Sequence, residues 1–233
     1  MALFKISGDK VVEVSETTFA EQNIKERGDL QRMLLDNIGV ISGNLMVITE
    51  EFGEWDDSKR RIDILAIDQD ANLVVIELKR TQDGGHMELQ AIRYAAMIST
   101  LTFDQVVQIH EKFLKSKGKD GDAKASILEF LEWNEVDEEQ FASDVRIILV
   151  AADFSKEITS AVLWLNSRDL DITCMRVKPY KLDEQVVLDV QQLIPLPEAE
   201  EYQVKVREKD KLKRSKRWVQ KSLSEIWREL EEK

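Results

Sequence analysis

Cysteine, proline and histidine are scarce in this sequence of 233 residues, which contains one cysteine, three prolines and two histidines. The single Cys174 excludes an intramolecular disulfide and a zinc site built from cysteines, and it fits a reducing compartment. His86 and His110 fall in separate predicted elements and lack the spacing of paired metal ligands. Both are therefore interpreted as ordinary histidines.

Long apolar runs are also missing. No stretch approaches the length of a membrane span, and the first residues lack the basic and then apolar pattern of a signal peptide. There is no glycine-rich phosphate loop and no nucleophile elbow, so kinase, NTPase and serine-hydrolase functions lack support. We expect a soluble, cytoplasmic protein whose chemistry lies elsewhere.

Acidic residues exceed basic ones, and the net charge of −12 argues against a non-specific coat for nucleic acid. The charge is uneven, because residues 205–221 hold nine Lys or Arg and two acids. Such a segment can grip phosphates, or it can be a solvated or oligomerising helix. The stretch 201–233 is predicted to be a charged helix. Its apolar positions need a partner, either the body of the protein or a second subunit in a homodimer.

The most informative stretch runs from residue 60 to residue 80. Two apolar, β-branched runs, 61–67 and 73–78, flank the turn-forming sequence DQDAN, a pattern that predicts a β-hairpin. If the hairpin is symmetric about Asp70, Asp63 lies opposite Glu77. Because side chains alternate along a strand, Glu77 and Lys79 share a face. The pattern therefore predicts two carboxylates and an ammonium group on one side of a sheet whose other side is apolar.

Buried carboxylates are costly unless they bind a cation or pair with the lysine. The oxygens of Asp63 and Glu77 suit a hard divalent ion such as Mg²⁺. Lys79 would then orient or activate a water molecule, or stabilise charge on a phosphate. The alternative is a structural cluster of ion pairs, since such networks resemble functional sites.

The neighbouring segments predict further elements. A helix is expected within 24–41, with an uncertain start at Gly28. Near that start, Glu26 and Asp29 lie about one turn apart and could face the same site, or could simply favour the helix N-terminus. A second helix within 86–100 places Gln90 and Tyr94 on one face, where they could support the site or serve ordinary packing.

The rest of the chain completes an α/β pattern. We expect an N-terminal β-hairpin over 1–16, a main domain over 17–200 and the charged C-terminal helix over 201–233. Within the main domain, a helical insertion is predicted around 103–143. A β-α-β unit follows from Val145, with Ser155 as the cap of its helix.

Several motifs together resemble a known group of enzymes. Asp63 followed by Glu77-x-Lys79 after a hairpin is similar to the PD-(D/E)xK nuclease superfamily, and Gln90-x-x-x-Tyr94 is similar to the extra motif of its RecB-like branch. Further blocks resemble the NucS-type endonucleases and their uncharacterised relatives, over roughly residues 20 to 200: ERGDLQ, RRIDILAID, NLVVIELKR, LQAIRYAA, VRIILVAADFS and ITSAVLWLN. The proline of the superfamily name is absent, since Ile62 precedes Asp63.

This resemblance implies a restriction-endonuclease-like α/β core, with a mixed central sheet flanked by helices. It implies that Asp63 and Glu77 are metal ligands, that Lys79 is the catalytic lysine and that Glu26 is a candidate further ligand. Gln90 and Tyr94 would support the site or contact the nucleic-acid backbone. The implied reaction is hydrolysis of DNA phosphodiester bonds with Mg²⁺ or Mn²⁺. The alternatives are a non-catalytic nucleic-acid-binding module and a dimerising scaffold that keeps the fold.

Overall fold

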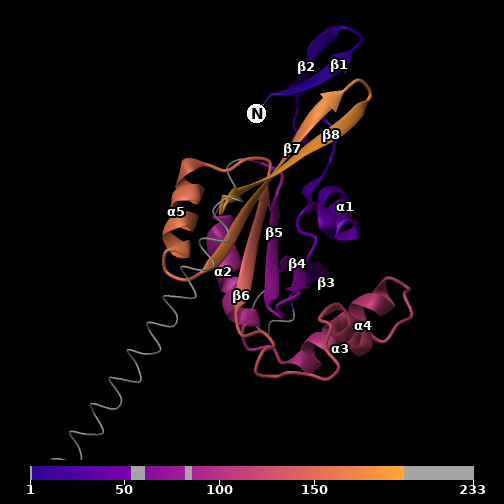
Figure 1. Ribbon diagram of the computed structural model, residues 1–233, viewed down its shortest axis with the longest axis vertical. Helices are drawn as coiled ribbons and strands as arrows, with labels where there is room; N and C mark the ends of the chain where they lie inside the picture. The colour runs from indigo at the N-terminus through magenta and orange to yellow at the C-terminus, as the bar shows by residue number, and fades with distance from the viewer. Residues whose placement is uncertain (1, 54–60, 82–85, 197–233) are drawn as a thin grey trace, which may run out of the picture. The chain divides into compact units, whose positions relative to one another are not determined.

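The computed structural model describes residues 2–53, 61–81 and 86–196, and a compact unit ends at Ile194 (Figure 1). Its strands are β1 (Leu3–Ser7), β2 (Lys10–Glu16), β3 (Leu45–Phe52), β4 (Ile62–Asp68), β5 (Leu73–Lys79), β6 (Val145–Ala151), β7 (Asp171–Leu182) and β8 (Gln185–Ile194). Its helical segments are η1 (Glu26–Leu30), α1 (Gln31–Asp36), η2 (Ile38–Val40), α2 (Met87–Ile98), α3 (Phe103–Ser116), α4 (Ala123–Phe130) and α5 (Lys156–Asn166). The predicted C-terminal helix, 201–233, lies outside the described residues.

The strands form one mixed sheet in the order β1-β2-β7-β6-β5-β4-β3, with β8 also pairing with β7. β6 runs parallel to both β5 and β7, and the other pairs are antiparallel. Helices α2 and α5 make the crossovers between the parallel strands, as parallel neighbours require. The predicted mixed α/β fold is confirmed.

The hairpin of β4 and β5 lies between β6 and the edge strand β3, and it has the predicted register. Ile67 pairs with Leu73 and Ile64 pairs with Ile76, so the hairpin is symmetric about Asp70. The buried carboxylate of Asp68 fixes the turn, because its Oδ1 accepts the backbone N–H groups of Asp70 and Asn72 at 3.0 and 2.9 Å. The turn chemistry and the apolar runs thus set the register together.

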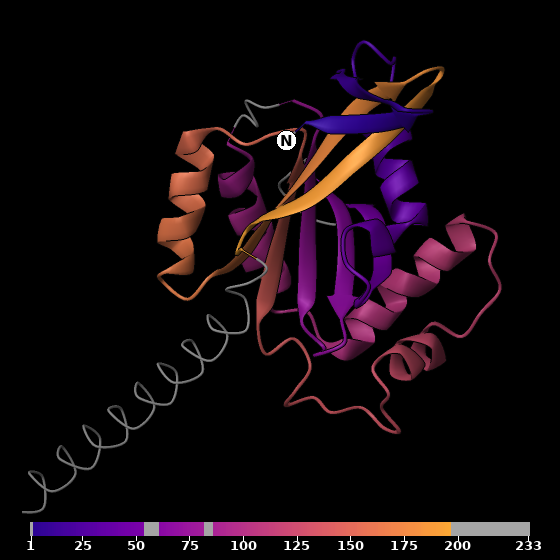
Figure 2. The same cartoon turned by 45° about the horizontal axis from the view of Figure 1, so that its top comes forward.

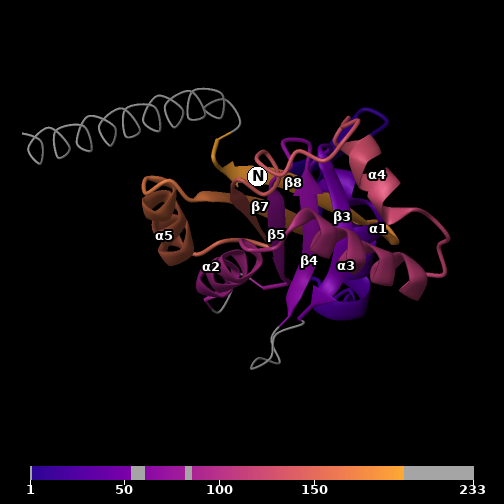
Figure 3. The same cartoon turned by 90° about the horizontal axis from the view of Figure 1, so that it is seen from below.

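Both faces of the sheet are covered (Figures 1 and 3). Helices α2, α3, α4 and α5 contribute to the core on one face, and the α1 region packs on the other, against residues such as Ile64 and Ile76. Every residue of β4 is buried, and in β5 only Lys79 is partly exposed. The face that carries the predicted site is therefore itself largely apolar, and the charged groups occupy only its end.

The helical segments after the hairpin match the sequence prediction in type. The predicted insertion contains α3 and α4, and α3 packs along β3 (Figure 3). A capping box of Thr102 and Gln105 begins α3, and the Ser155 hydroxyl accepts the Ile158 N–H to begin α5. The N-terminal hairpin of β1 and β2 joins the sheet by pairing β2 with β7 (Figure 2).

The predicted first helix is shorter than its sequence pattern. Arg27 has an extended backbone, with ψ of 139°, and Gly28 has φ of 89°, so regular α-helix begins only at Gln31. A positive φ is readily adopted only by glycine, which is why the kink falls at Gly28. This kink allows η1 to reach the end of β5 instead of continuing the helix. Among the described helices, none is long and apolar enough to cross a membrane.

Candidate functional site

The predicted site lies where β4 begins and β5 ends. Continuing the hairpin register by one pair places Asp63 opposite Glu77. Asp63 is 4% exposed, and its Oδ2 accepts the backbone N–H of Leu78 at 2.8 Å. From the other face, Gln31 of α1 donates its side-chain N–H to the Asp63 carbonyl at 3.0 Å. The Asp63 carboxylate therefore accepts a backbone N–H group of β5 at the end of the β4–β5 pairing.

Glu77 is fully buried, with 0% of its surface exposed. Its Oε1 accepts a hydrogen bond from Gln90 Nε2 at 2.7 Å, and the same Nε2 lies 3.1 Å from the Tyr94 hydroxyl. Its Oε2 is buried and has no hydrogen-bond partner among the described residues. A buried carboxylate oxygen without a donor is unfavourable, and it requires a physical explanation. A cation at this oxygen would supply one.

Burial raises the pKa of both carboxyl groups. The pKa of Asp63 rises to about 6, mainly because the buried group is removed from water, and the nearby Lys79 opposes this rise. The pKa of Glu77 rises to about 8, first through burial and then through repulsion from Asp63, and Lys79 again opposes the rise. A divalent ion between these groups would favour their charged forms.

Lys79 connects the carboxylate pair to η1. Its Nζ donates to the Leu78 carbonyl at 3.0 Å and lies 3.6 Å from Glu26 Oε1. The other oxygen of Glu26, Oε2, accepts the backbone N–H of Arg80 at 2.8 Å. The structure therefore brings Glu26 to the end of β5, where it holds Lys79 and the chain that follows it.

Asp29 has a local hydrogen-bond partner in the structure. Its Oδ2 accepts the backbone N–H of Lys25 at 2.9 Å, so it closes the turn that leads into η1. The kink at Gly28 separates the directions of Glu26 and Asp29, which a regular helix would have kept on one face.

Two charged residues near the site were missed by sequence reasoning. The charges of Glu51 and Arg27 both shift the pKa of Asp63, Glu51 upward and Arg27 downward. Arg27 Nε lies 3.6 Å from Glu51 Oε1. The sequence placed Glu51 near the end of a strand, but only the register of β3 against β4 shows that it stands beside Asp63.

The hydrogen bond of His110 is to β3 and involves no predicted site residue. His110 is buried on α3, where its Nδ1 lies 2.8 Å from the carbonyl oxygen of Ile48 in β3. Burial lowers its pKa. His86 precedes α2 with a left-handed backbone, at φ of 65°.

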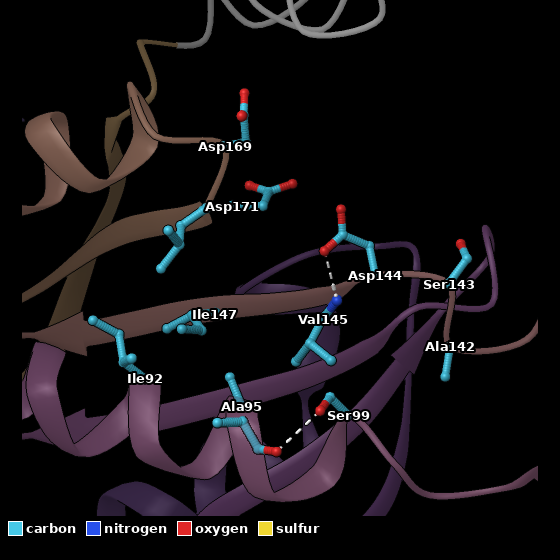
Figure 4. Close-up of a pocket in the computed structure, with 12 residues that line it drawn as sticks. Ile92, Ala95, Ser99, Ala142, Ser143, Asp144, Val145, Ile147, Asp169 and Asp171 are labelled. Carbon is cyan, nitrogen blue, oxygen red and sulfur yellow. Dashed lines mark hydrogen bonds between the residues drawn. The ribbon is translucent and has the colours of Figure 1, made fainter. Parts of the chain in front are cut away.

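Two cavities lie at the sheet. One, of about 440 Å³, has no predicted site residue in its wall, which includes Arg80 and Thr81, the residues that follow Lys79 in the chain, together with Lys178, Thr17 and Thr18. The other, of about 360 Å³, contains none of the predicted site residues and is shown in Figure 4. Its floor includes Ile92 and Ile147, and its rim carries Asp144, Asp169 and Asp171.

The donor set suits a hard divalent cation. Asp63 and Glu77 offer carboxylate oxygens, the ligands that Mg²⁺ and Mn²⁺ prefer, and one of these oxygens has no donor. Within the described ranges, no group of three acidic, His or Cys side chains is arranged to hold a metal ion as it stands. The site therefore presents a carboxylate pair with a lysine, at the end of the β4–β5 hairpin of a mixed sheet. The mixed sheet flanked by helices is the fold that the sequence resemblance implied.

Comparisons with known proteins give the following findings. No family model matches the sequence, and no curated protein matches it. Among solved structures, a repair endonuclease from Pyrococcus abyssi is similar at 21% identity and a TM-score of 0.35, over 71% of this chain and 51% of its own. The EndoMS–dsDNA2 complex is similar at 18% identity and a TM-score of 0.35, over 74% of this chain and 49% of its own.

EndoMS without DNA is also similar, at 18% identity and a TM-score of 0.34, over 71% of this chain and 49% of its own. The chain thus spans about half the length of these structures.

Proposed function

We propose that this chain is a metal-dependent nuclease that hydrolyses phosphodiester bonds in DNA. One observation carries the proposal, namely the buried Oε2 of Glu77, which has no hydrogen-bond partner in the described structure and lies at a carboxylate pair. Asp189 Oδ2 is also buried without a hydrogen bond, but it lies 3.6 Å from the guanidinium group of Arg176. Glu77 has no such ion pair among the described residues, and the charge of Asp63 repels it. A bound cation would instead stabilise the charged forms of the Asp63–Glu77 pair.

Asp63 and Glu77 would hold the ion, Mg²⁺ or Mn²⁺, with Glu26 as a candidate further ligand. When bound, such an ion polarises a phosphate and lowers the pKa of a water molecule. Lys79, close to both carboxylates, orients the attacking water or stabilises the charge that develops on the phosphate. Glu26 positions Lys79 through its contact of 3.6 Å.

Gln90 and Tyr94 position the site from α2. The side-chain N–H group of Gln90 fixes one oxygen of Glu77 and leaves the other free for the ion. Tyr94 is 2% exposed and lies beside that amide, so it limits the movement of Gln90. In this role neither residue needs to contact the substrate, although the resemblance also allows contact with a nucleic-acid backbone.

DNA is the proposed substrate, and the cavity of about 440 Å³ would receive part of it. Arg80 and Lys178 line this cavity and carry the positive charge that attracts phosphates, while Thr17, Thr18 and Thr81 offer hydroxyl groups. Glu16 pairs with Lys178 at 2.8 Å and limits this charge. The predicted homodimer and the basic grip of 205–221 depend on residues outside the described ranges and remain predictions.

The test is cleavage of labelled single-stranded, duplex and branched DNA with Mg²⁺ or Mn²⁺. Wild type would be compared with Glu77→Gln and Lys79→Ala, and Lys115→Ala, an exposed lysine on α3, serves as the matched control. We expect both site variants to lose roughly 10²–10⁴-fold in rate and the control to keep its rate. EDTA should abolish cleavage.

The other outcomes separate the alternatives. Tight, salt-sensitive DNA binding without cleavage would replace the nuclease with a binding module. If the cleavage rate is unchanged in Glu77→Gln, Asp63, Glu77 and Lys79 do not form the active site. If the chain neither binds nor cleaves any of these DNA substrates, the result would favour the dimerising scaffold.

A further inference from the structure

The end of β3 brings a third carboxylate into line with the site. Glu50 pairs with Ile64 and Phe52 pairs with Ile62, so Glu51 stands opposite Asp63. On the other side of β4, the continued hairpin register places Glu77 opposite Asp63. Residues directly opposite each other on neighbouring strands have adjacent side chains. Asp63 and Glu77 are therefore neighbours. Glu51 occupies the position opposite Asp63 on the other side of β4, close enough for its charge to raise the pKa of Asp63.

Glu51 has an unusual backbone at this point. Its φ is 48°, in the left-handed region that residues with a side chain seldom adopt. The residues on either side of it are paired with β4, so the conformation is held within a strand and is not the fraying of a loose end. Backbone strain of this kind is concentrated at functional sites, where the surrounding structure holds it in place.

Arg27 is the counter-ion of Glu51 in the structure. Its Nε lies 3.6 Å from Glu51 Oε1, while its own side chain is 66% exposed. The charge of Arg27 also lowers the pKa of Asp63 and Glu77, so it lies within electrostatic reach of both. An exposed ion pair of this length is weak and can be exchanged for a stronger partner.

We propose that Glu51 is a further ligand of the divalent ion at Asp63 and Glu77, and that Arg27 holds its carboxylate until the ion binds. The inference rests on the metal dependence in the proposed function. The buried oxygen of Glu77, unpartnered within the described residues, is the same sign of a cation that supports the proposed function. A third carboxylate adds the charge and the ligand that the Asp63–Glu77 pair lacks.

The experiment measures Mn²⁺ binding to the full chain without DNA, by calorimetry and by the loss of the free Mn²⁺ signal in electron paramagnetic resonance. Wild type is compared with Glu51→Gln, which keeps size and removes charge. Glu50→Gln is the matched control, because its carboxylate pairs with Lys117, which directly follows α3. We expect Glu51→Gln to weaken binding about tenfold or more and Glu50→Gln to change it less than about twofold.

A second variant tests the role of Arg27. Arg27→Gln should tighten Mn²⁺ binding several-fold in wild type, and this gain should be lost when Glu51→Gln is also present. A gain that persists in the double variant would show that Arg27 acts only by general repulsion, which overturns its proposed role. Urea unfolding of each variant confirms that the chain is folded.

The outcomes distinguish the two proposals. If wild type and Glu51→Gln bind Mn²⁺ equally, Glu51 is no ligand, and the metal dependence of the nuclease still stands. If wild type binds no Mn²⁺, the proposed metal dependence fails, and the role of Glu51 fails with it.

Discussion

Two buried aspartates at opposite ends of β4 have very different surroundings. Asp68, at the end of the strand, is 0% exposed and receives hydrogen bonds from two backbone N–H groups and from Arg146 Nη1 at 2.9 Å. Asp63, near its beginning, is almost as buried but faces a second carboxylate, Glu77. The strand thus contains one fully matched acid and one that repels its neighbour.

This difference separates structure from function within a single hairpin. The surroundings of Asp68 stabilise the turn and require nothing more. The surroundings of Asp63 and Glu77 lower stability in the absence of a cation. Unfavourable arrangements of this kind are concentrated at functional sites. Substitutions at each end of the hairpin test this contrast.

The largest effect is expected at the matched end. Asp68→Ala would leave the two turn N–H groups without their acceptor and remove a buried charge partner of Arg146. Breaking such a buried pair costs about 3–5 kcal/mol. Urea unfolding should therefore show a large fall in the free energy of unfolding. Asp70→Ala, an exposed change in the same turn, is the control, and a loss below about 1 kcal/mol for Asp68→Ala would contradict the contrast.

The sequence predicts the hairpin well because local and long-range signals agree there. The turn residues and the two β-branched runs require the same register, and a shift by one residue would turn every apolar side chain to the wrong face. The start of the first helix was less predictable. An apolar stripe indicates which residues face the core, but the backbone turn at Gly28 depends on contacts with β5, as the Glu26 bond to Arg80 shows.

A smaller effect, with the opposite sign, is expected at the unmatched end. The pKa of Glu77 is raised in the folded chain, so its contribution to stability is fully present below its unfolded pKa, about 4.3, and is lost as pH rises through about 8. The metal-free protein should therefore lose stability between pH 5 and pH 8. Glu77→Gln should remove most of this loss and raise the free energy of unfolding at pH 8, by on the order of 2 kcal/mol.

The measurement is urea unfolding in EDTA at both pH values. Glu111→Gln, an exposed change on α3, is the control and should follow wild type. If Glu77→Gln is less stable than wild type at pH 8, Glu77 is a matched structural acid like Asp68, and the contrast is wrong.

Within the site, the sequence could place residues on a common strand or helix but could not relate separate elements. Glu77 and Lys79 follow from strand alternation, and Gln90 and Tyr94 from helical spacing. Glu51 depends on how β3 aligns with β4, and that alignment shifts between Val47 and Thr49. Such an irregularity in the pairing has no clear local signature. Arg27 was missed because it lies in the kink at Gly28.

The smallest effect is expected where α2 meets the pair. Gln90→Met keeps the packing volume but removes the hydrogen bond of 2.7 Å to Glu77, so the charged form of Glu77 loses its side-chain donor. The cost should be about 1 kcal/mol at pH 8 and smaller at pH 5, where Glu77 is protonated. Melting temperatures in EDTA at the two pH values measure it.

The same variant decides between the two interpretations of Gln90. If Gln90 serves only the packing of α2, Gln90→Met should change the melting temperature equally at both pH values and leave Mn²⁺ affinity unchanged. If it holds Glu77 for the ion, the melting effect should depend on pH and Mn²⁺ affinity should fall several-fold. Leu89→Ala, a change at an exposed residue next to Gln90 on α2, is the control. It should change neither the pH dependence of the melting temperature nor the Mn²⁺ affinity. A positioning role for Gln90 thus requires both a pH-dependent melting effect and a loss of Mn²⁺ affinity. The contribution of side-chain packing alone would not depend on the charge of Glu77.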